Sequence, residues 1–259
     1  MDGIYQHFRK DEAPLIDELQ SQISTAATEY RPVLTDFLDP RQIHIARTLT
    51  GTNGTVKCHV FGGYIGAERA RVIFVPDYFA PDLIDFEVAP LEINYPEKFA
   101  ELHHSQVLGT VANAGIRMTA FGDIITDGSR WQLFTTKTMS DWVQENITKL
   151  GRISVRFEAI GLDQVVTPQN DWQPAQLSMS SLRLDSLVGH AFAISRARAK
   201  ALIESAKVRL NFELIDRPDA AVGDADIVSV RGFGRIRVNS VLGVSKKGKE
   251  RVAVDIIKK

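Results

Sequence analysis

Basic and hydroxyl side chains gather at the start of a predicted helix in the last third of the chain. Ser195 precedes the run Arg196-Ala197-Arg198-Ala199-Lys200, and its hydroxyl is suited to cap a helix whose first turn carries two guanidinium groups. Free backbone N–H groups and the positive end of the helix dipole attract anions at such a helix start, and neighbouring arginines add charge-assisted hydrogen bonds. These residue types at this spacing indicate a binding site for phosphate groups.

Further basic residues extend this site along the same part of the chain. The predicted binding set is Arg183, Ser195, Arg196, Arg198, Lys200, Lys207, Arg209, Arg231 and Arg235. Contacts of this kind hold a phosphate backbone in place without discriminating between bases. The predicted ligand is therefore a nucleic acid held by its backbone.

A helix pair followed by a small sheet is expected to position these residues. Leu184, Leu187 and Val188 recur at helical spacing, and a second helix begins at Ser195. Strands are then expected over residues 208–210 and 227–230, with turns at 216–218 and 222–224. This order resembles the alpha-L motif of the S-four domain, which occurs in ribosomal proteins, stand-alone RNA-binding proteins and RNA-modifying enzymes. The resemblance implies RNA as the partner.

The chain departs from the alpha-L motif at two turns. Ala206 stands where the motif usually has a glycine after the second helix, and Phe212 follows Asn211 where a glycine is common. Alanine and phenylalanine are strained at positive φ, whereas glycine is not. We expect these departures to affect the local backbone path more than the basic surface.

Charge is divided unevenly along the chain. Residues 182–259 hold 16 Lys and Arg against 9 Asp and Glu, a net charge of +7, whereas residues 1–181 hold 15 against 23, a net charge of −8. The whole-chain value of −1 hides this division. Only the last part of the chain is therefore expected to bind polyanions in general.

Length and composition indicate an ordinary globular protein. The chain has 259 residues, of which 44% are hydrophobic and 24% are charged, which is enough for two or three compact domains. No run approaches 18 apolar residues, and no basic start followed by an apolar segment opens the chain. The single cysteine, Cys58, excludes an intramolecular disulfide and fits a reducing compartment. We expect a cytoplasmic protein without a membrane partner.

The N-terminal part predicts helices followed by two strands. Apolar residues from Leu15 to Tyr30 recur at three- and four-residue spacing, and the pattern continues after Asp39-Pro40. Strands are expected over residues 56–61 and 70–75. The connection from Gly62 to Arg69 is rich in glycine but lacks the Lys-Ser/Thr of a P-loop, which favours a tight hairpin over a nucleotide site.

The middle of the chain predicts the order βαββαβ. Strands are expected near residues 91–95, 116–126, 131–136 and 153–157, and helices over 99–113 and 138–150. This is the ferredoxin-like order that RNA-recognition motifs also use. The third strand offers Trp131 and Phe134 for base stacking without the basic signature of those motifs, so an RNA contact on this sheet stays open.

The expected fold class is α+β. The predicted domains are an N-terminal helical/αβ domain (1–88), a ferredoxin-like, RNA-recognition-like middle domain (89–162), a polar linker without periodicity (163–181), and an S-four-type alpha-L RNA-binding domain (182–259). The last domain is expected to end in a hairpin of Val238–Val244 and Arg251–Ile257, with Lys246, Lys247 and Lys249 at its tip.

An RNA-modifying enzyme is one alternative. Arg183-Leu184-Asp185 also resembles the catalytic motif of pseudouridine synthases, in which Asp185 would be the nucleophile. Those enzymes place a large catalytic domain around the motif, whereas only 74 residues follow Asp185 here. We therefore expect a buried Asp185 that orients Arg183 or caps a helix. No Gly-x-Gly-x-x-Gly follows a predicted strand, which argues against a methyltransferase.

The remaining polar clusters predict neither catalysis nor metal binding. His103 and His104 are adjacent, so on a helix they point about 100° apart, without a Cys or another His at ligand spacing. Asp123 and Asp127 lie near Gly128, where turn chemistry accounts for both. The sequence thus predicts no enzyme, no metal and no cofactor.

Motifs spread over nearly the whole chain resemble the YlmH family. They are the turn Phe61 to Arg69, a middle segment with His104, Leu108-Gly109, Gly115-Ile116-Arg117 and Gly122-Asp123-Ile124, and the C-terminal Arg231-Gly232-Phe233-Gly234-Arg235. After His104 the family commonly has Arg-Asp, whereas this chain has Ser105-Gln106. The resemblance therefore implies no role for charged side chains at these two positions.

The resemblance implies a cytoplasmic, non-enzymatic protein whose partner is RNA, either rRNA or tRNA, with no DNA expected. It also implies association with the large ribosomal subunit bearing peptidyl-tRNA during rescue of stalled translation. A protein-interaction scaffold linked to cell division, whose acidic front recruits a partner, is a further alternative.

Overall fold

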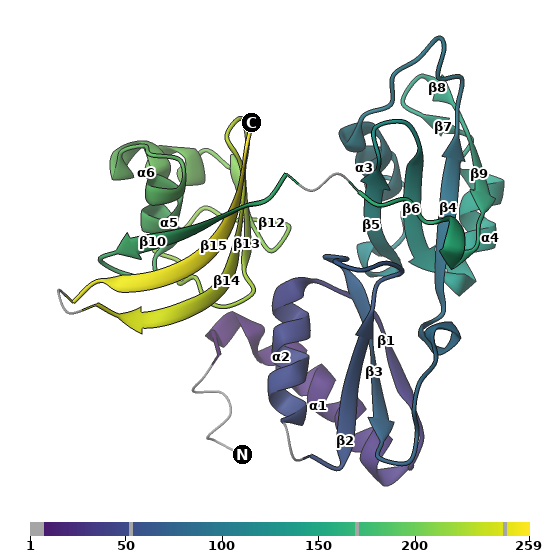
Figure 1. The fold of residues 1–259 in the computed structure, drawn as a ribbon, viewed down its shortest axis with the longest axis horizontal. Coiled ribbons are helices and arrows are strands. Elements are labelled where there is room, and N and C mark those ends of the chain that lie inside the picture. Colours follow the sequence, from purple (N-terminus) through teal and green to yellow (C-terminus); the bar gives the residue numbers. More distant parts are fainter. Residues whose placement is uncertain (1–7, 52–53, 169–170, 246–247) are drawn as a thin grey trace. The chain divides into compact units, whose positions relative to one another are not determined.

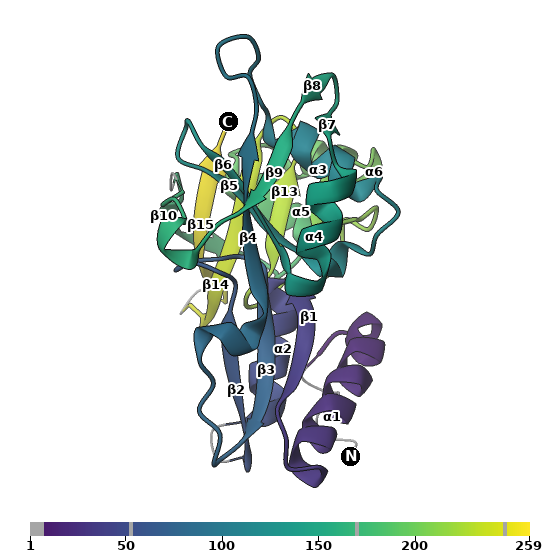
Figure 2. The ribbon, with the colours of Figure 1, turned by 90° about the vertical axis from the view of Figure 1, so that its right-hand side faces the viewer.

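The computed structural model describes residues 8–51, 54–168, 171–245 and 248–259. The chain forms two compact units, which we call the front unit (residues 13–169) and the basic unit (residues 170–259 with residues 1–12). Both combine helices with antiparallel sheets, in agreement with the expected α+β class (Figures 1 and 2). In the part of the chain that the structure describes, no helix is both long and apolar enough to cross a membrane.

The first half of the front unit is a three-stranded sheet with two helices. Its elements are α1(Ala13–Thr28), β1(Val33–Leu38), α2(Pro40–Thr50), β2(Val56–Phe61) and β3(Ala70–Pro76), and the sheet order is β1-β3-β2. Asp39 begins α2 by accepting a hydrogen bond from the backbone N–H of Gln42. The two predicted helices and strands β2 and β3 are confirmed, whereas β1 was not predicted.

The second half of the front unit has the order βαββαβ. Its main elements are β4(Val88–Asn94), α3(His104–Ala112), β5(Phe121–Thr126), β6(Trp131–Thr136), α4(Lys137–Asn146) and β9(Arg156–Ala159), with antiparallel sheet order β5-β6-β4-β9. Short 3-10 helices lie at η3(Leu83–Phe86), η4(Met118–Ala120) and η5(Leu162–Gln164). Apolar residues of both helices and of the sheet share one core.

Several boundaries in this half differ from the prediction. Helix α3 begins five residues later than expected, where the backbone N–H of His103 donates to the Gln106 side chain. Helix α4 ends at Asn146, because the next residues form β7(Lys149–Leu150), which pairs with β8(Ile153–Ser154). Residues 118–120 of the expected second strand are a 3-10 helix, because the strand itself begins at Phe121.

The basic unit is a six-stranded sheet with a helix pair on one face. Its elements are β10(Gln173–Met179), α5(Leu184–Ala191), α6(Arg196–Glu204), β11(Val208–Leu210), β12(Glu213–Leu214), β13(Ile227–Val230), β14(Gly234–Val244) and β15(Glu250–Lys258), with sheet order β10-β15-β14-β13-β11-β12. The 3-10 turn η2(Lys10–Glu12) also belongs to this unit. Arg9 Nη1 donates to the buried carboxylate of Asp226 at 2.7 Å.

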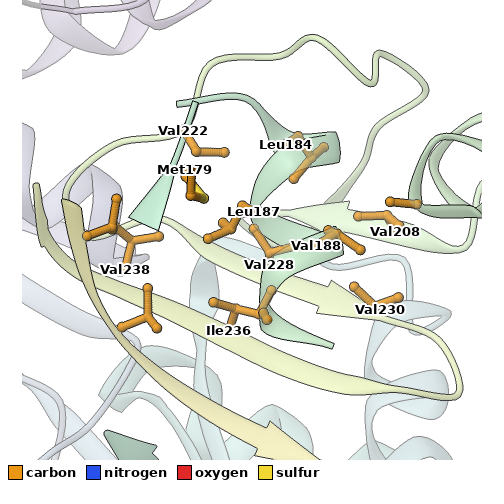
Figure 3. Close-up of a cluster of buried hydrophobic side chains, with 14 of the residues drawn as sticks. Met179, Leu184, Leu187, Val188, Val208, Val222, Val228, Val230, Ile236 and Val238 are labelled. Carbon is orange, nitrogen blue, oxygen red and sulfur yellow. The ribbon is translucent and has the colours of Figure 1, made fainter. Parts of the chain in front are cut away.

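One apolar core joins α5 and α6 to the sheet. Figure 3 shows Met179, Leu187, Ile236 and Val238 gathered in this core, and all four are almost fully buried. Residues alternate between the two faces of a strand. Because Ile236 and Val238 face the helices, Arg235 and Arg237 point to the opposite face of the sheet.

The predicted linker is wrong over much of its length. Residues 173–179 form β10 and pair with β15 from Gln173↔Ile256 to Met179↔Glu250. Ala175, Leu177 and Met179 alternate with Gln176 and Ser178, which is a strand signal that the prediction overlooked among the surrounding polar residues. The predicted C-terminal hairpin is confirmed as β14 and β15, whereas Lys246 and Lys247 lie outside the described residues.

Candidate RNA interface

Helices α5 and α6 are positioned by the apolar residues that they bury. Leu184, Leu187 and Val188 on α5 and Ala199 and Ile203 on α6 contribute to the core of the basic unit. The opposite surface of α6 is polar. Ser195 begins α6, and its hydroxyl accepts a hydrogen bond from the backbone N–H of Arg198 at 3.2 Å, as the sequence predicted.

A buried carboxylate joins the two helices and holds two arginines. Asp185 is only 3% exposed. It accepts hydrogen bonds from Arg183 Nε at 3.2 Å, Arg183 Nη2 at 3.1 Å and Arg196 Nε at 3.0 Å. Burial disfavours the charge of Asp185, but these hydrogen bonds outweigh burial and hold its pKa below the ordinary value. The guanidinium groups remain accessible, with side-chain exposures of 38% for Arg183 and 57% for Arg196.

Arg198 is held by a different contact. Its Cζ lies 5.3 Å from the centroid of the Phe233 ring, and Phe233 packs against Phe192 with ring centroids 5.7 Å apart. Phe233 lies in the turn that also carries Arg231, whose backbone N–H donates to the Lys207 carbonyl oxygen at 2.8 Å. This bond places Lys207 and Arg231 opposite each other, next to the ends of β11 and β13.

The structure does not bring all nine predicted residues together. Arg183, Ser195, Arg196 and Arg198 surround the start of α6, and Lys200 is exposed on the next turn, where its ammonium lies 3.6 Å from Glu204. Arg209 and Arg235 are on the other face of the sheet, because each is opposite Ser229 in the strand register while Ile236 and Val208 face the core. Arg209 and Arg235 therefore do not extend the path from α6 on the same face of the sheet, and their contact with RNA stays a prediction. We call the set Arg183, Ser195, Arg196, Arg198 and Lys200 the helix-face cluster.

Both departures from the alpha-L motif occur at left-handed backbone positions. Ala206 has a φ of 54°, Asn211 a φ of 50° and Phe212 a φ of 69°. These residues adopt the left-handed conformation that favours glycine, although alanine and phenylalanine are strained there.

The front unit contains a polar junction that sequence reasoning misassigned. Asp123 lies on β5 and accepts hydrogen bonds from the Tyr64 hydroxyl at 2.8 Å and the backbone N–H groups of Glu68 and Arg69 at 2.7 and 3.1 Å. Burial, with a further contribution from the charge of Glu68, raises the pKa of Asp123 to about 6, although the hydrogen bonds lower it. Asp123 therefore fixes the glycine-rich hairpin and is not a turn residue. The turn role of Asp127 is confirmed by its bonds to the N–H groups of Ser129 and Arg130.

The same hairpin covers part of the sheet where an RNA-recognition motif would bind bases. Phe134 is fully buried, and its ring lies 5.2 Å from that of Tyr64. Phe37, Ile125 and Val166 complete this contact. A Cβ at Gly63, which has a φ of 102°, would lie 2.3 Å from the Phe134 ring, so the hairpin needs glycine there. Phe134 is therefore packed inside the front unit and is not available for stacking on RNA.

The next question is whether the described residues include a group of metal ligands or a reactive cysteine. Within residues 8–51, 54–168, 171–245 and 248–259, no group of three His, Cys, Asp or Glu side chains could hold a metal ion. Cys58 is half-buried, and burial raises the pKa of its thiol to about 11, which keeps the thiol protonated at neutral pH.

Trp172, Arg237 and Phe233 were missed as possible functional residues. Arg235-Ile236-Arg237 alternates as a strand with a basic face, which is a signal the sequence contains. Trp172 could not be assigned to the same face without knowing that the segment after it pairs with β15. Phe233 acts through its ring contact with Arg198, and that contact depends on the tertiary fold.

The fold and the helix-face cluster define an α+β protein with a basic helix pair beside an antiparallel sheet. Two family models match the front unit: "YlmH, N-terminal" over residues 13–79, and "Putative RNA-binding domain in YlmH" over residues 81–164. The chain is 35% identical over 255 residues to the Ribosome-associated protein quality control protein P2 of Bacillus subtilis (strain 168), covering 98% of this chain and 99% of the relative.

A solved structure leads to the same family. The Cell division protein ylmH from Streptococcus pneumoniae is 36% identical, with a TM-score of 0.54, and the match covers 64% of this chain and all of that one. The chain belongs to the YlmH family.

Proposed function

We propose that this protein binds RNA through the helix-face cluster and associates with the ribosome. The observation that carries the proposal is the arrangement at the start of α6, where Asp185 holds two accessible guanidinium groups beside a capped helix start. Such an arrangement suits phosphate groups. The name of the Bacillus subtilis relative, a ribosome-associated quality control protein, supports the ribosome as the assembly that supplies the RNA.

We further propose that the protein acts in the cytoplasm, in rescue of stalled translation. The bound particle is the large ribosomal subunit carrying peptidyl-tRNA, and the RNA is rRNA or tRNA. Residues 182–259 act as an S-four-type alpha-L domain and residues 89–162 as an RNA-recognition-like domain. The order of helix pair and sheet in the first, and the β5-β6-β4-β9 sheet in the second, support these two assignments.

We also propose that the protein is not an enzyme. The carboxylate of Asp185 accepts three hydrogen bonds from two arginines and is almost fully buried. A nucleophile needs access to its substrate, whereas a carboxylate in this setting positions Arg183 and Arg196. Mass analysis of RNA incubated with the protein tests this, and a modified nucleoside in that RNA would overturn the proposal.

The RNA-binding proposal predicts strong dependence on salt. If about five phosphate contacts form, the logarithm of affinity falls against the logarithm of salt concentration with a slope of about −3.5, or about a hundredfold from 50 to 200 mM. Arg196→Glu should abolish binding of a structured RNA hairpin while the circular dichroism spectrum stays unchanged. Arg31→Glu, the same charge change at an exposed site in the front unit, is the control and should bind nearly as tightly as the wild type. Unchanged binding by a folded Arg196→Glu variant would remove Arg196 from the site.

The ribosome proposal is tested by gradient fractionation of cell extract. Under low salt and translational stalling, the protein should migrate with large subunits, and the Arg196→Glu variant should shift to ribosome-free fractions. Cross-link mapping then identifies the bound RNA. Migration of the wild type only in ribosome-free fractions would contradict the proposal.

A second candidate is a scaffold linked to cell division. The name of the Streptococcus pneumoniae protein, a cell division protein, favours it, and the acidic residues 1–181 carry a net charge of −8 that suits a basic protein partner. Co-purification of the full chain with one protein and no RNA would favour this candidate over the first.

A further inference from the structure

The face of the six-stranded sheet that points away from α5 and α6 is basic and aromatic. Strand register aligns Arg209, Ser229, Arg235 and Ile257 in one row across β11, β13, β14 and β15. Trp172 extends this row, because it precedes Gln173, which is opposite Ile256. With strands about 4.8 Å apart, the row spans about 19 Å.

Two arginines hold the Trp172 ring. Arg235 Cζ lies 5.4 Å and Arg237 Cζ 4.8 Å from the ring centroid. Arg237 is fixed from the other side, since its Nη2 and Nε donate to Asp255 Oδ2 at 2.7 and 3.2 Å. Burial opposes ionisation of Asp255, but hydrogen bonds from Arg237 and Asn239 outweigh it and hold the pKa of Asp255 below the ordinary value. The indole is therefore held beside two cations on a rigid sheet.

The charges of this face favour a polyanion. This face carries four cations, Arg209, Arg235, Arg237 and Arg251. Among the residues directly opposite them on neighbouring strands, Asp255 is the carboxylate. Leu214, opposite Arg209, is 58% exposed and adds apolar surface at the end of the row. Proteins that bind single-stranded nucleic acid combine such a row of cations with an aromatic ring on which a base stacks.

We propose that this face is a second RNA site, separate from the helix-face cluster, and that it binds a single strand by stacking a base on Trp172. Arg235 and Arg209 would contact the phosphates along the row. The inference rests on the proposed RNA-binding function. It deepens that function, because a protein with a site on each face of one sheet can bind a structured segment and an unpaired strand at the same time.

The test uses the full chain and a 12-nucleotide oligo(U) RNA. In a Trp131→Phe/Trp142→Phe variant, Trp172 is the one remaining tryptophan of the three in the chain, and its fluorescence should fall on addition of oligo(U). Trp172→Ala should weaken oligo(U) binding about tenfold, whereas Trp172→Phe should bind within about threefold of the wild type, because phenylalanine keeps a stacking surface.

Matched variants separate this inference from the proposed function. Arg196→Glu should lose binding of the RNA hairpin and keep the oligo(U) quench. Trp172→Ala should keep binding of the RNA hairpin and bind a fluorescently labelled oligo(U) about tenfold more weakly, measured by anisotropy. If Arg196→Glu binds the RNA hairpin as tightly as the wild type while the oligo(U) results hold, the helix-face site is contradicted and the Trp172 site is not. Absence of a quench, or equal oligo(U) binding by the wild type and Trp172→Ala, would overturn the inference.

Discussion

Each unit contains an aspartate with limited access to water, and the pKa values of the two aspartates are shifted in opposite directions. In the basic unit, Asp185 is bound by two guanidinium groups, and its pKa lies below the ordinary value. In the front unit, Asp123 is bound by a tyrosine hydroxyl and two backbone amides, and its pKa is raised to about 6. The difference lies in the partners, since cations compensate for burial and neutral donors do so only in part.

The partners also determine what each carboxylate can do for the protein. Asp185 keeps two exposed cations in fixed positions at a surface, which is useful for binding a ligand. Asp123 satisfies backbone groups of a hairpin that packs on Phe134, which is useful for holding the front unit together. We therefore expect Asp123 to govern stability and Asp185 to govern affinity.

The largest expected effect is on the stability of the front unit. Asp123→Ala leaves two backbone N–H groups and the Tyr64 hydroxyl without their acceptor, which should lower the free energy of unfolding by about 3 kcal/mol. Urea unfolding measures this free energy, followed by the fluorescence of Trp131 and Trp142 in a Trp172→Phe background. Asp127→Ala is the control, because that exposed carboxylate also accepts two backbone N–H bonds, and its loss should cost about 1 kcal/mol. Equal costs would mean that burial does not distinguish the two sites.

A smaller effect is expected on RNA affinity. Asp185→Asn removes the charge that holds Arg183 and Arg196, so binding of an RNA hairpin should weaken about tenfold, or about 1.4 kcal/mol. Asp219→Asn removes the same charge from a carboxylate that also acts electrostatically on Arg183, and it should leave affinity unchanged or slightly tighter. If both variants bind more tightly, Asp185 contributes only repulsion, and the comparison between the two carboxylates fails.

The smallest effect is a difference in pH dependence. The native pKa of Asp185 is depressed, so its contribution to stability is present above the ordinary pKa of about 3.9 and is lost as pH falls through the native pKa. The native pKa of Asp123 is about 6, so its contribution is full below about pH 3.9 and is lost as pH rises through 6. The stability difference between wild type and Asp123→Asn should therefore change between about pH 4 and 6. For Asp185→Asn it should change only below about pH 4, measured by urea unfolding through Trp172.

Periodic segments made much of the fold predictable. The apolar spacing of Leu184, Leu187 and Val188, and the alternation in the final hairpin, each correspond to a buried face in the structure. Strand β10 was predictable in part, because Ala175, Leu177 and Met179 alternate with Gln176 and Ser178, but the polar residues around this short run concealed it. The sequence does not reveal the early end of α4, because Ile147 and Leu150 continue its apolar spacing. Both residues lie beyond the end of the helix and are buried in the same core.

The start of α6 was predictable because capping and charge are local properties of neighbouring residues. The position of Arg235 was not, because its face depends on which neighbours of β14 are buried. The role of Asp123 was hidden for a similar reason, since its three donors lie 54 to 59 residues away in the chain. Long-range contacts of this kind leave no spacing signal in the sequence.

The pairing of β10 with β15 also bears on how the protein is made. Residues 173–179 leave the ribosome before the rest of the sheet, but their strand partner β15 emerges only with residues 250–258, and β15 lies between β10 and the other strands. The front unit has no such dependence, since its strands pair within residues 33–159. During synthesis the front unit can therefore fold while the basic unit is still incomplete, and the nascent chain acquires its Trp172 face last.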